Sequence, residues 1–265
     1  MKKNVGYKVV PLTFNRRAVM ASATVTKEKN TIHGITEVDI TEPRRLMQKH
    51  FERTGEKLSL TAYIVTCLAH VLKDHPLLNS FHKGRKQIIL DNVTVSVLVE
   101  REINGEKVPE PIGISKAETK TYLQIHNEIR DAQRQRSDYL GSFSGMSWAR
   151  FIPDFLFLTF IRIADHNIRM AKRYGKVCVT AVGMFGRDAV WFVPHGSATV
   201  LVTVGGINRK IIKVDEELVE REHLCLTVSF DHNIVDGSPA ARFMKQFSET
   251  VKSGNLLNTD NMIIN

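Results

Sequence analysis

The chain has 265 residues, of which 43% are hydrophobic and 25% charged, a composition typical of a globular domain with a sizeable core. Its net charge of +9 suits an anionic partner, but the Lys and Arg residues are spread along the chain, so nucleic acid is not expected. A phosphate-bearing small ligand and a solvated basic surface fit this charge equally well.

No segment has the features of a secretory signal, and the longest apolar run, Phe151 to Ile163, is too short to span a membrane. The cysteines Cys67, Cys178 and Cys225 lie in apolar stretches without the spacing of metal ligands. They are interpreted as buried, reduced thiols. We therefore expect a soluble cytoplasmic protein with no metal site, no disulfide framework and no membrane contact.

The first half of the chain alternates between strand and helix patterns, judged by the periodicity of its apolar residues. The most distinctive segment is Leu58 to Leu72, which is apolar on most sides and predicts a buried helix. The expected elements, in chain order, are an extended segment from Val19 to Thr26, a strand from Ile32 to Thr41, a helix from Glu42 to Thr54, this buried helix, a hairpin near Lys83-Gly84 and a strand from Val93 to Val99.

The second half continues this mixture without the strict strand-helix rhythm of a doubly wound sheet. The expected elements are a polar helix within Ser115 to Gln133, one or two amphipathic helices from Met146 to Tyr174 joined near Pro153, strands from Lys176 to Val182, Ser197 to Gly206 and His223 to Phe230, and a last helix from about Pro239 to Lys252. We therefore predict a single α/β domain over residues 1–265, with a mixed sheet and helices on one face.

The last predicted strand leads to a histidine in the stretch "VSFDHNIVDGSPAARF". The alternation of the strand places His232 on its apolar side, toward the interior. Asp236-Gly237 is a turn pair, and Ser238 is a good N-cap for the following helix. Two interpretations remain: a core histidine with satisfied hydrogen bonds, or a histidine held at a strand end to move protons.

This stretch resembles the active-site segment of the dihydrolipoamide acyltransferases, the catalytic cores of 2-oxo-acid dehydrogenase complexes, and of the related chloramphenicol acetyltransferases. The resemblance extends in order along nearly the whole chain. The other matching segments are Val10 to Thr41, "GEKLSLTAYIVTCLAHVLKDHPLLNSF", "VTAVGMFG" (Val179 to Gly186) and "VPHGSATVLVTVGGI".

The resemblance implies a two-layer α/β sandwich that assembles as trimers, with active sites at subunit interfaces and coenzyme A as a substrate. It makes His232 the general base and places Thr180 where the family has a serine that donates to the oxyanion. Asp236 would support the histidine loop by pairing with Arg16 or Arg17, and Gly237 would serve the turn.

Simpler interpretations of these residues stay open. Thr180 can be an ordinary strand residue, and Arg16 with Arg17 a solvated basic pair. Gly183 is interpreted as a turn residue, and His33, His195 and His223 as structural or exposed.

Some features depart from the family pattern. Position 233 is Asn where the dehydrogenase cores usually have Arg, and Phe143 to Tyr174 is unlike the corresponding family region. The match begins within the first dozen residues, so no lipoyl or subunit-binding domain is expected ahead of it.

Three hypotheses follow. The first is an acyltransferase moving an acyl group from acyl-CoA to a small-molecule or carrier-bound thiol, hydroxyl or amine. The second is a lipoamide acyltransferase core served by a lipoyl group on another chain. The third is a non-catalytic oligomeric scaffold. The acyl chain, the acceptor and the existence of a larger cage are not specified by the sequence.

Overall fold

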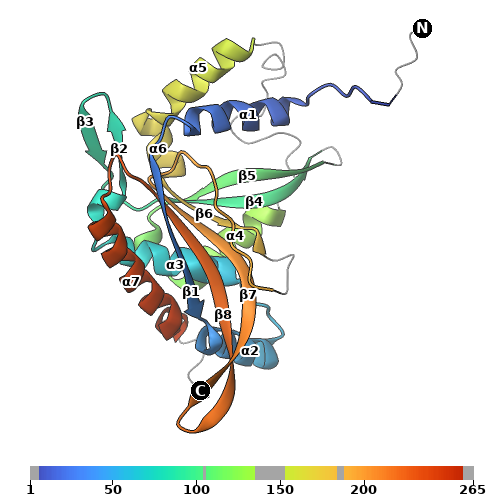
Figure 1. Ribbon diagram of the computed structural model, residues 1–265, viewed down its shortest axis with the longest axis vertical. Helices are drawn as coiled ribbons and strands as arrows, with labels where there is room; N and C mark the ends of the chain where they lie inside the picture. Colours follow the sequence, from blue (N-terminus) through green and yellow to red (C-terminus); the bar gives the residue numbers. More distant parts are fainter. Residues whose placement is uncertain (1–5, 104–105, 135–152, 184–187, 259–265) are drawn as a thin grey trace.

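The computed structural model describes residues 6–103, 106–134, 153–183 and 188–258 of the chain (Figure 1). Its α-helices are α1 (Phe14–Thr26), α2 (Thr41–Thr54), α3 (Leu60–Leu72), α4 (Tyr122–Arg134), α5 (Asp154–Asp165), α6 (Ile168–Tyr174), α7 (Gly237–Ser253) and α8 (Asn255–Asn258), with short 3₁₀ helices η1 (Pro76–Leu78) and η2 (Ala117–Thr119). Its strands are β1 (Thr31–Asp39), β2 (Ser80–Lys83), β3 (Lys86–Ile89), β4 (Val95–Ile103), β5 (Glu106–Ile114), β6 (Val177–Ala181), β7 (Val200–Val214) and β8 (Glu217–Asp231).

Six strands form one mixed sheet in the order β1-β8-β7-β6-β4-β5. Strand β6 runs parallel to both of its neighbours, and every other pair in this sheet is antiparallel. The strands β2 and β3 form a separate hairpin, as the Lys83-Gly84 pair predicts. The predicted mixed sheet is therefore confirmed.

A helical layer covers one face of this sheet and encloses the main core. Helix α3 lies at its centre, in contact with α4, α7 and the strands β4 and β6 (Figure 1). Its Ser59 cap accepts a hydrogen bond from the backbone N–H of Ala62 at 3.2 Å. The side chains of Tyr63, Ile64 and Leu68 are fully buried, so the prediction of a buried helix from Leu58 to Leu72 is confirmed.

Helix α1 corrects the extended segment expected from Val19 to Thr26. The helix begins after Thr13, whose hydroxyl accepts a hydrogen bond from the backbone N–H of Arg16, and it packs against α5 (Figure 1). The valines and threonines of this segment have a higher strand propensity, but the N-cap and the contact with α5 outweigh that local preference.

The region from Phe143 to Tyr174 is described only from residue 153 onward; residues 143–152 lie outside the described part. From residue 153 onward it contains α5, which begins directly after Pro153, and α6, and the two are separated at His166-Asn167. The expected junction near Pro153 involves residues outside the described part. Asn167 caps α6, because its side chain accepts from the backbone N–H groups of Arg169 and Met170. Within the described residues, no helix combines the length and apolar character needed to cross a membrane.

The strands β7 and β8 form a long hairpin whose outer half extends beyond the sheet (Figure 1). Strand β1 pairs with β8 only as far as His223, so the residues between Asn208 and Glu222 pair with one another alone. The turn at Asp215 and Glu216 has φ angles of 46° and 73°, which suit a tight hairpin. The expected strands, Ser197 to Gly206 and His223 to Phe230, are therefore correct in place, but β7 starts three residues later than expected and both strands extend farther toward the hairpin turn.

Candidate active site

The turn after β8 carries His232. The apolar residues of β8 that face the helical layer, Leu224, Leu226, Val228 and Phe230, are all buried. The strand ends at Asp231, whose carbonyl oxygen accepts from the backbone N–H groups of Ile234 and Val235 at 2.9 and 3.0 Å. Helix α7 then begins at Gly237, with Asp236 at the N-cap position. The prediction of Ser238 as the N-cap is wrong, because Ser238 lies inside the helix and accepts a hydrogen bond from Arg242.

The predicted inward orientation of His232 is also wrong. Its side chain is 44% exposed, because the alternation of β8 stops at Asp231 and the chain turns there. The imidazole Nδ1 lies 3.7 Å from a carboxylate oxygen of Asp236. The backbone N–H of His232 donates to the carbonyl of Asn30 at 2.6 Å. His232 is therefore an accessible side chain on a tightly held backbone, which rules out the interpretation as a core histidine.

Asp236 is very exposed, at 86% of its side chain, and its carboxylate lies beside the imidazole of His232. The pairing expected with Arg16 is absent among the described residues, because Arg16 lies on α1, which packs against α5. Arg17 lies on the same helix. Gly237 begins α7 with open space around its Cβ position, so the expected need for glycine in a turn is not supported there.

Thr180 lies on β6, on the sheet face opposite the main helical layer. It pairs with Thr203 of β7, which pairs with Thr227 of β8. Thr180 and Thr203 line a cavity of about 510 Å³ that α1, α5 and α6 also border. The hydroxyls of Thr203 and Thr227 are buried without a hydrogen-bond partner among the described residues. A row of strand hydroxyls therefore crosses this face of the sheet.

The structure does not bring Thr180 and His232 together within one chain. Thr180 is level with Thr227, and His232 follows Thr227 by five residues of about 3.3 Å each, so about 17 Å separates them along the sheet. His232 does not line the cavity that contains Thr180. Within a single chain, the two side chains cannot act on the same bond.

Two further histidines lie on the face of the sheet that carries Thr180. His33 of β1 forms a 2.8 Å hydrogen bond through Nδ1 with the hydroxyl of Ser229, and His195 lines the cavity beside Thr180. Burial lowers the pKa of His33, and the nearby His195 lowers it further. His195 is thus a second candidate base, and no sequence pattern distinguished it.

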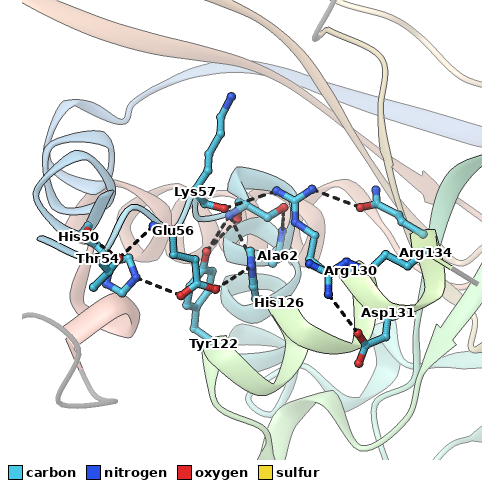
Figure 2. Close-up of polar contacts among 12 residues, drawn as sticks. His50, Thr54, Glu56, Lys57, Ala62, Tyr122, His126, Arg130, Asp131 and Arg134 are labelled. Atoms are coloured by element: carbon cyan, nitrogen blue, oxygen red, sulfur yellow. Dashed lines mark hydrogen bonds and ion pairs between the residues drawn. The ribbon is translucent and has the colours of Figure 1, made fainter. Parts of the chain in front are cut away.

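A cluster of two histidines and a glutamate lies elsewhere, between α2, α3 and α4 (Figure 2). The Glu56 carboxylate lies 3.4 Å from Nε2 of His50 and 3.6 Å from Nε2 of His126. The backbone N–H of Ser59 donates to Nδ1 of His126, so the proton of a neutral His126 must lie on Nε2, the nitrogen a metal would need. In the described part of the chain, no group of histidine, cysteine or acidic side chains is arranged to hold a metal.

Comparisons with known proteins were made for sequence and for fold. Residues 4–145 and 169–258 match the family model described as 2-oxoacid dehydrogenases acyltransferase (catalytic domain). The acetyltransferase component of the acetoin cleaving system of Bacillus subtilis is 25% identical over 244 residues, 89% of this chain and 53% of the relative. The acetyltransferase component of the pyruvate dehydrogenase complex of Mycoplasma genitalium is 26% identical over 199 residues, 74% of this chain and 44% of the relative. The chain thus spans about half the length of these curated relatives.

Solved structures share the fold at lower identity. A probable dihydrolipoamide acetyltransferase from Listeria monocytogenes aligns with a TM-score of 0.70 and 22% identity over 96% of this chain and 98% of that chain. The Azotobacter vinelandii dihydrolipoamide acetyltransferase aligns with a TM-score of 0.70 and 17% identity over 97% and 96% of the two chains. The predicted two-layer acyltransferase fold is therefore confirmed.

Proposed function

The chain belongs to the family of 2-oxoacid dehydrogenase acyltransferase catalytic domains, and from this premise we propose that it transfers an acyl group between a lipoyl thiol and coenzyme A, with His232 as the general base. The single observation that carries the proposal is the accessible imidazole of His232 on a tightly held turn, with Asp236 beside its Nδ1. A proton carrier needs both this access and this fixed position.

The spacing of three residues supports the assignment. The catalytic mechanism of the Azotobacter vinelandii enzyme has been investigated at a serine, a histidine and an asparagine, with the serine 52 positions before the histidine and the asparagine four after it. In this chain, Thr180 precedes His232 by the same 52 positions, and Asp236 follows it by four. We therefore assign the oxyanion donor to Thr180 and the orienting group to Asp236.

The chemistry is a direct transfer between two thiols. Asp236 faces Nδ1 of His232, which leaves Nε2 to accept the proton of the attacking thiol. The thiolate then attacks the thioester carbonyl, and the hydroxyl of Thr180 donates a hydrogen bond to the oxyanion of the tetrahedral intermediate. When the intermediate collapses, the leaving thiolate takes the proton from the imidazolium.

This mechanism requires a second copy of the chain. The separation of about 17 Å along the sheet places Thr180 and His232 of one chain at different reaction centres. We propose that His232 of one copy meets Thr180 of its neighbour in a closed symmetric oligomer, a trimer. The open cavity around Thr180 is where the neighbour's turn and the thioester would enter.

The relatives favour the lipoyl thiol over other acceptors. Both acetyltransferase components described above are dihydrolipoyllysine-residue acetyltransferases by name, which supports a lipoyl carrier as the second substrate. Transfer from acyl-CoA to another thiol, hydroxyl or amine is the second candidate. It is favoured by residues 146–168, which fall outside the family match and include all of α5.

The decisive experiment incubates the purified protein with acetyl-CoA, propionyl-CoA and isobutyryl-CoA and follows the release of free CoA, with and without dihydrolipoamide. We expect release that depends on dihydrolipoamide and is lost in His232→Ala but retained in His195→Ala. Release without dihydrolipoamide would support the second candidate. Full activity of His232→Ala would overturn the assignment of the base, and complete inactivity of the wild-type oligomer would favour a scaffold.

A further inference from the structure

Four charged side chains lie buried beneath the turn that carries His232. The side chains of Lys29, Asp165, Lys176 and Asp231 are only 13%, 8%, 7% and 6% exposed. They come from separate places: the residues before β1, the end of α5, the residue before β6 and the end of β8. Buried charges are unfavourable unless they are paired, so each of these groups depends on the others.

Lys29 connects this cluster. Its Nζ lies 3.4 Å from a carboxylate oxygen of Asp231 and 3.7 Å from one of Asp165, and it donates a hydrogen bond to the carbonyl of Ser197. Lys176 contacts the other oxygen of Asp165 at 2.7 Å. Burial alone would raise the pKa of Asp165, but Lys176 and Lys29 outweigh it and hold that pKa below its usual value. Asp165 is therefore an ionised carboxylate between two ammonium groups.

The cluster reaches the backbone on both sides of His232. Asp231 accepts a hydrogen bond from the backbone N–H of Asn233 at 3.1 Å. Asn30, next to Lys29, accepts the backbone N–H of His232 at 2.6 Å and donates its side-chain amide to Asn233 at 3.0 Å. The segment Lys29-Asn30 thus holds the turn both before and after the histidine.

The imidazole itself has little else to orient it. The side chain of His232 is 44% exposed, and its contact with the exposed Asp236 is long, at 3.7 Å. Its position therefore comes mainly from its backbone. We infer that Lys29, anchored by Asp165, is a positioning residue that fixes the His232 turn for proton transfer. This inference rests on the proposed function of His232.

The anchor differs from the rest of the site in one respect. Asp165 ends α5 and falls within residues 146–168, which the family match does not cover. A small cavity of about 160 Å³ lies beside the cluster. The other titratable side chains that border it are Glu28, His82 and His166. The support of the turn is therefore provided in part by a segment outside the residues that match the family model.

The test compares Lys29→Met and Asp165→Asn with wild type in the CoA-release assay with dihydrolipoamide. A displaced base slows the chemical step without weakening substrate binding. We expect kcat to fall about 10- to 100-fold, while KM for acyl-CoA and dihydrolipoamide stays within about twofold. Lys210→Met is the matched control, because Lys210 is paired with Glu37 away from this turn, and it should retain wild-type kcat.

Hydrogen exchange provides a readout independent of activity. The His232 amide is hydrogen-bonded to Asn30, so its exchange in Lys29→Met should be about tenfold faster than in wild type and unchanged in Lys210→Met. The inference would be overturned if Lys29→Met and Asp165→Asn both had the kcat of wild type and the same exchange rate at the His232 amide. If Lys29→Met does not fold, the same two measurements on Asp165→Asn test the inference, because that substitution only replaces a carboxylate oxygen by an amide nitrogen. A failure of the proposed function can be told apart from a failure of this inference. If His232 is not the base, His232→Ala would keep the activity of wild type.

Discussion

The backbone N–H of Ser59 donates a hydrogen bond to Nδ1 of His126 over 3.2 Å (Figure 2). This bond joins the start of α3 to α4 and can form only while Nδ1 is unprotonated. Burial lowers the pKa of His126, and Arg130 lowers it further, against the opposing effect of Glu56. The fold therefore favours the neutral imidazole.

We expect this histidine to make the protein sensitive to acid. A folded-state pKa below the unfolded value of about 6.5 means that its contribution to stability is fully present above pH 6.5 and is lost as the pH falls toward the folded-state pKa. Urea unfolding between pH 7.5 and 5 should show a shallower loss of unfolding free energy for His126→Gln than for wild type. His70→Gln, at an exposed position of α3, is the control, and an equal pH dependence in all three proteins would refute the prediction.

Gly183 is required by a close approach of the backbone. A Cβ atom there would lie 1.7 Å from the carbonyl oxygen of Gly205, an impossible contact with backbone. We expect Gly183→Ala to lower the unfolding free energy by about 1–3 kcal/mol, as overpacking does. Gly237→Ala is the matched control, because its Cβ meets nothing within 4 Å and alanine is the better helix former. Chemical denaturation measures both, and equal stability of the two variants would contradict the close-approach argument.

The sequence was sufficient to predict those strands and helices in which the spacing of the apolar residues matches the buried face of the element. The strand alternation from Leu224 to Phe230 and the helical stripe of Phe243, Phe247 and Val251 correspond to buried faces of β8 and α7. Strand β5 was not expected, because Pro109 and Pro111 interrupt its pattern. It lies at the edge of the sheet, where proline is tolerated.

The support of the candidate site was beyond prediction for a physical reason. Lys29, Asp165 and Lys176 belong to three segments far apart in the chain, and each looks like an ordinary surface charge in its local sequence. Only the packing of α5 and β6 against the turn after β8 brings them together. The outward orientation of the His232 side chain was not predicted either. Side chains alternate between the two faces of a sheet only within a strand, and β8 ends at Asp231.

Asp236 should affect activity far more than stability. Its side chain is very exposed and its close polar contact is with His232, so Asp236→Ala should change the unfolding free energy by less than about 1 kcal/mol. We expect kcat for Asp236→Ala to fall at least about tenfold, less than the roughly 10²–10⁴ expected for loss of the base itself. Asp236→Asn keeps an oxygen that can accept the Nδ1–H, and it should retain most of the activity. Equal kcat in wild type and Asp236→Ala would exclude an orienting role.

The geometry of Thr180 and His232 makes a prediction about mixed oligomers. Thr180→Val should lower kcat about 10²–10³-fold, and Thr180→Ser should preserve it, because only the hydroxyl is needed at the oxyanion. If His232 of one copy meets Thr180 of the next, refolding His232→Ala and Thr180→Val chains together creates some sites with both native residues. Random mixing in equal amounts should restore about a quarter of the wild-type activity per site. A site contained in one chain would give no recovery, and neither variant refolded alone should show any.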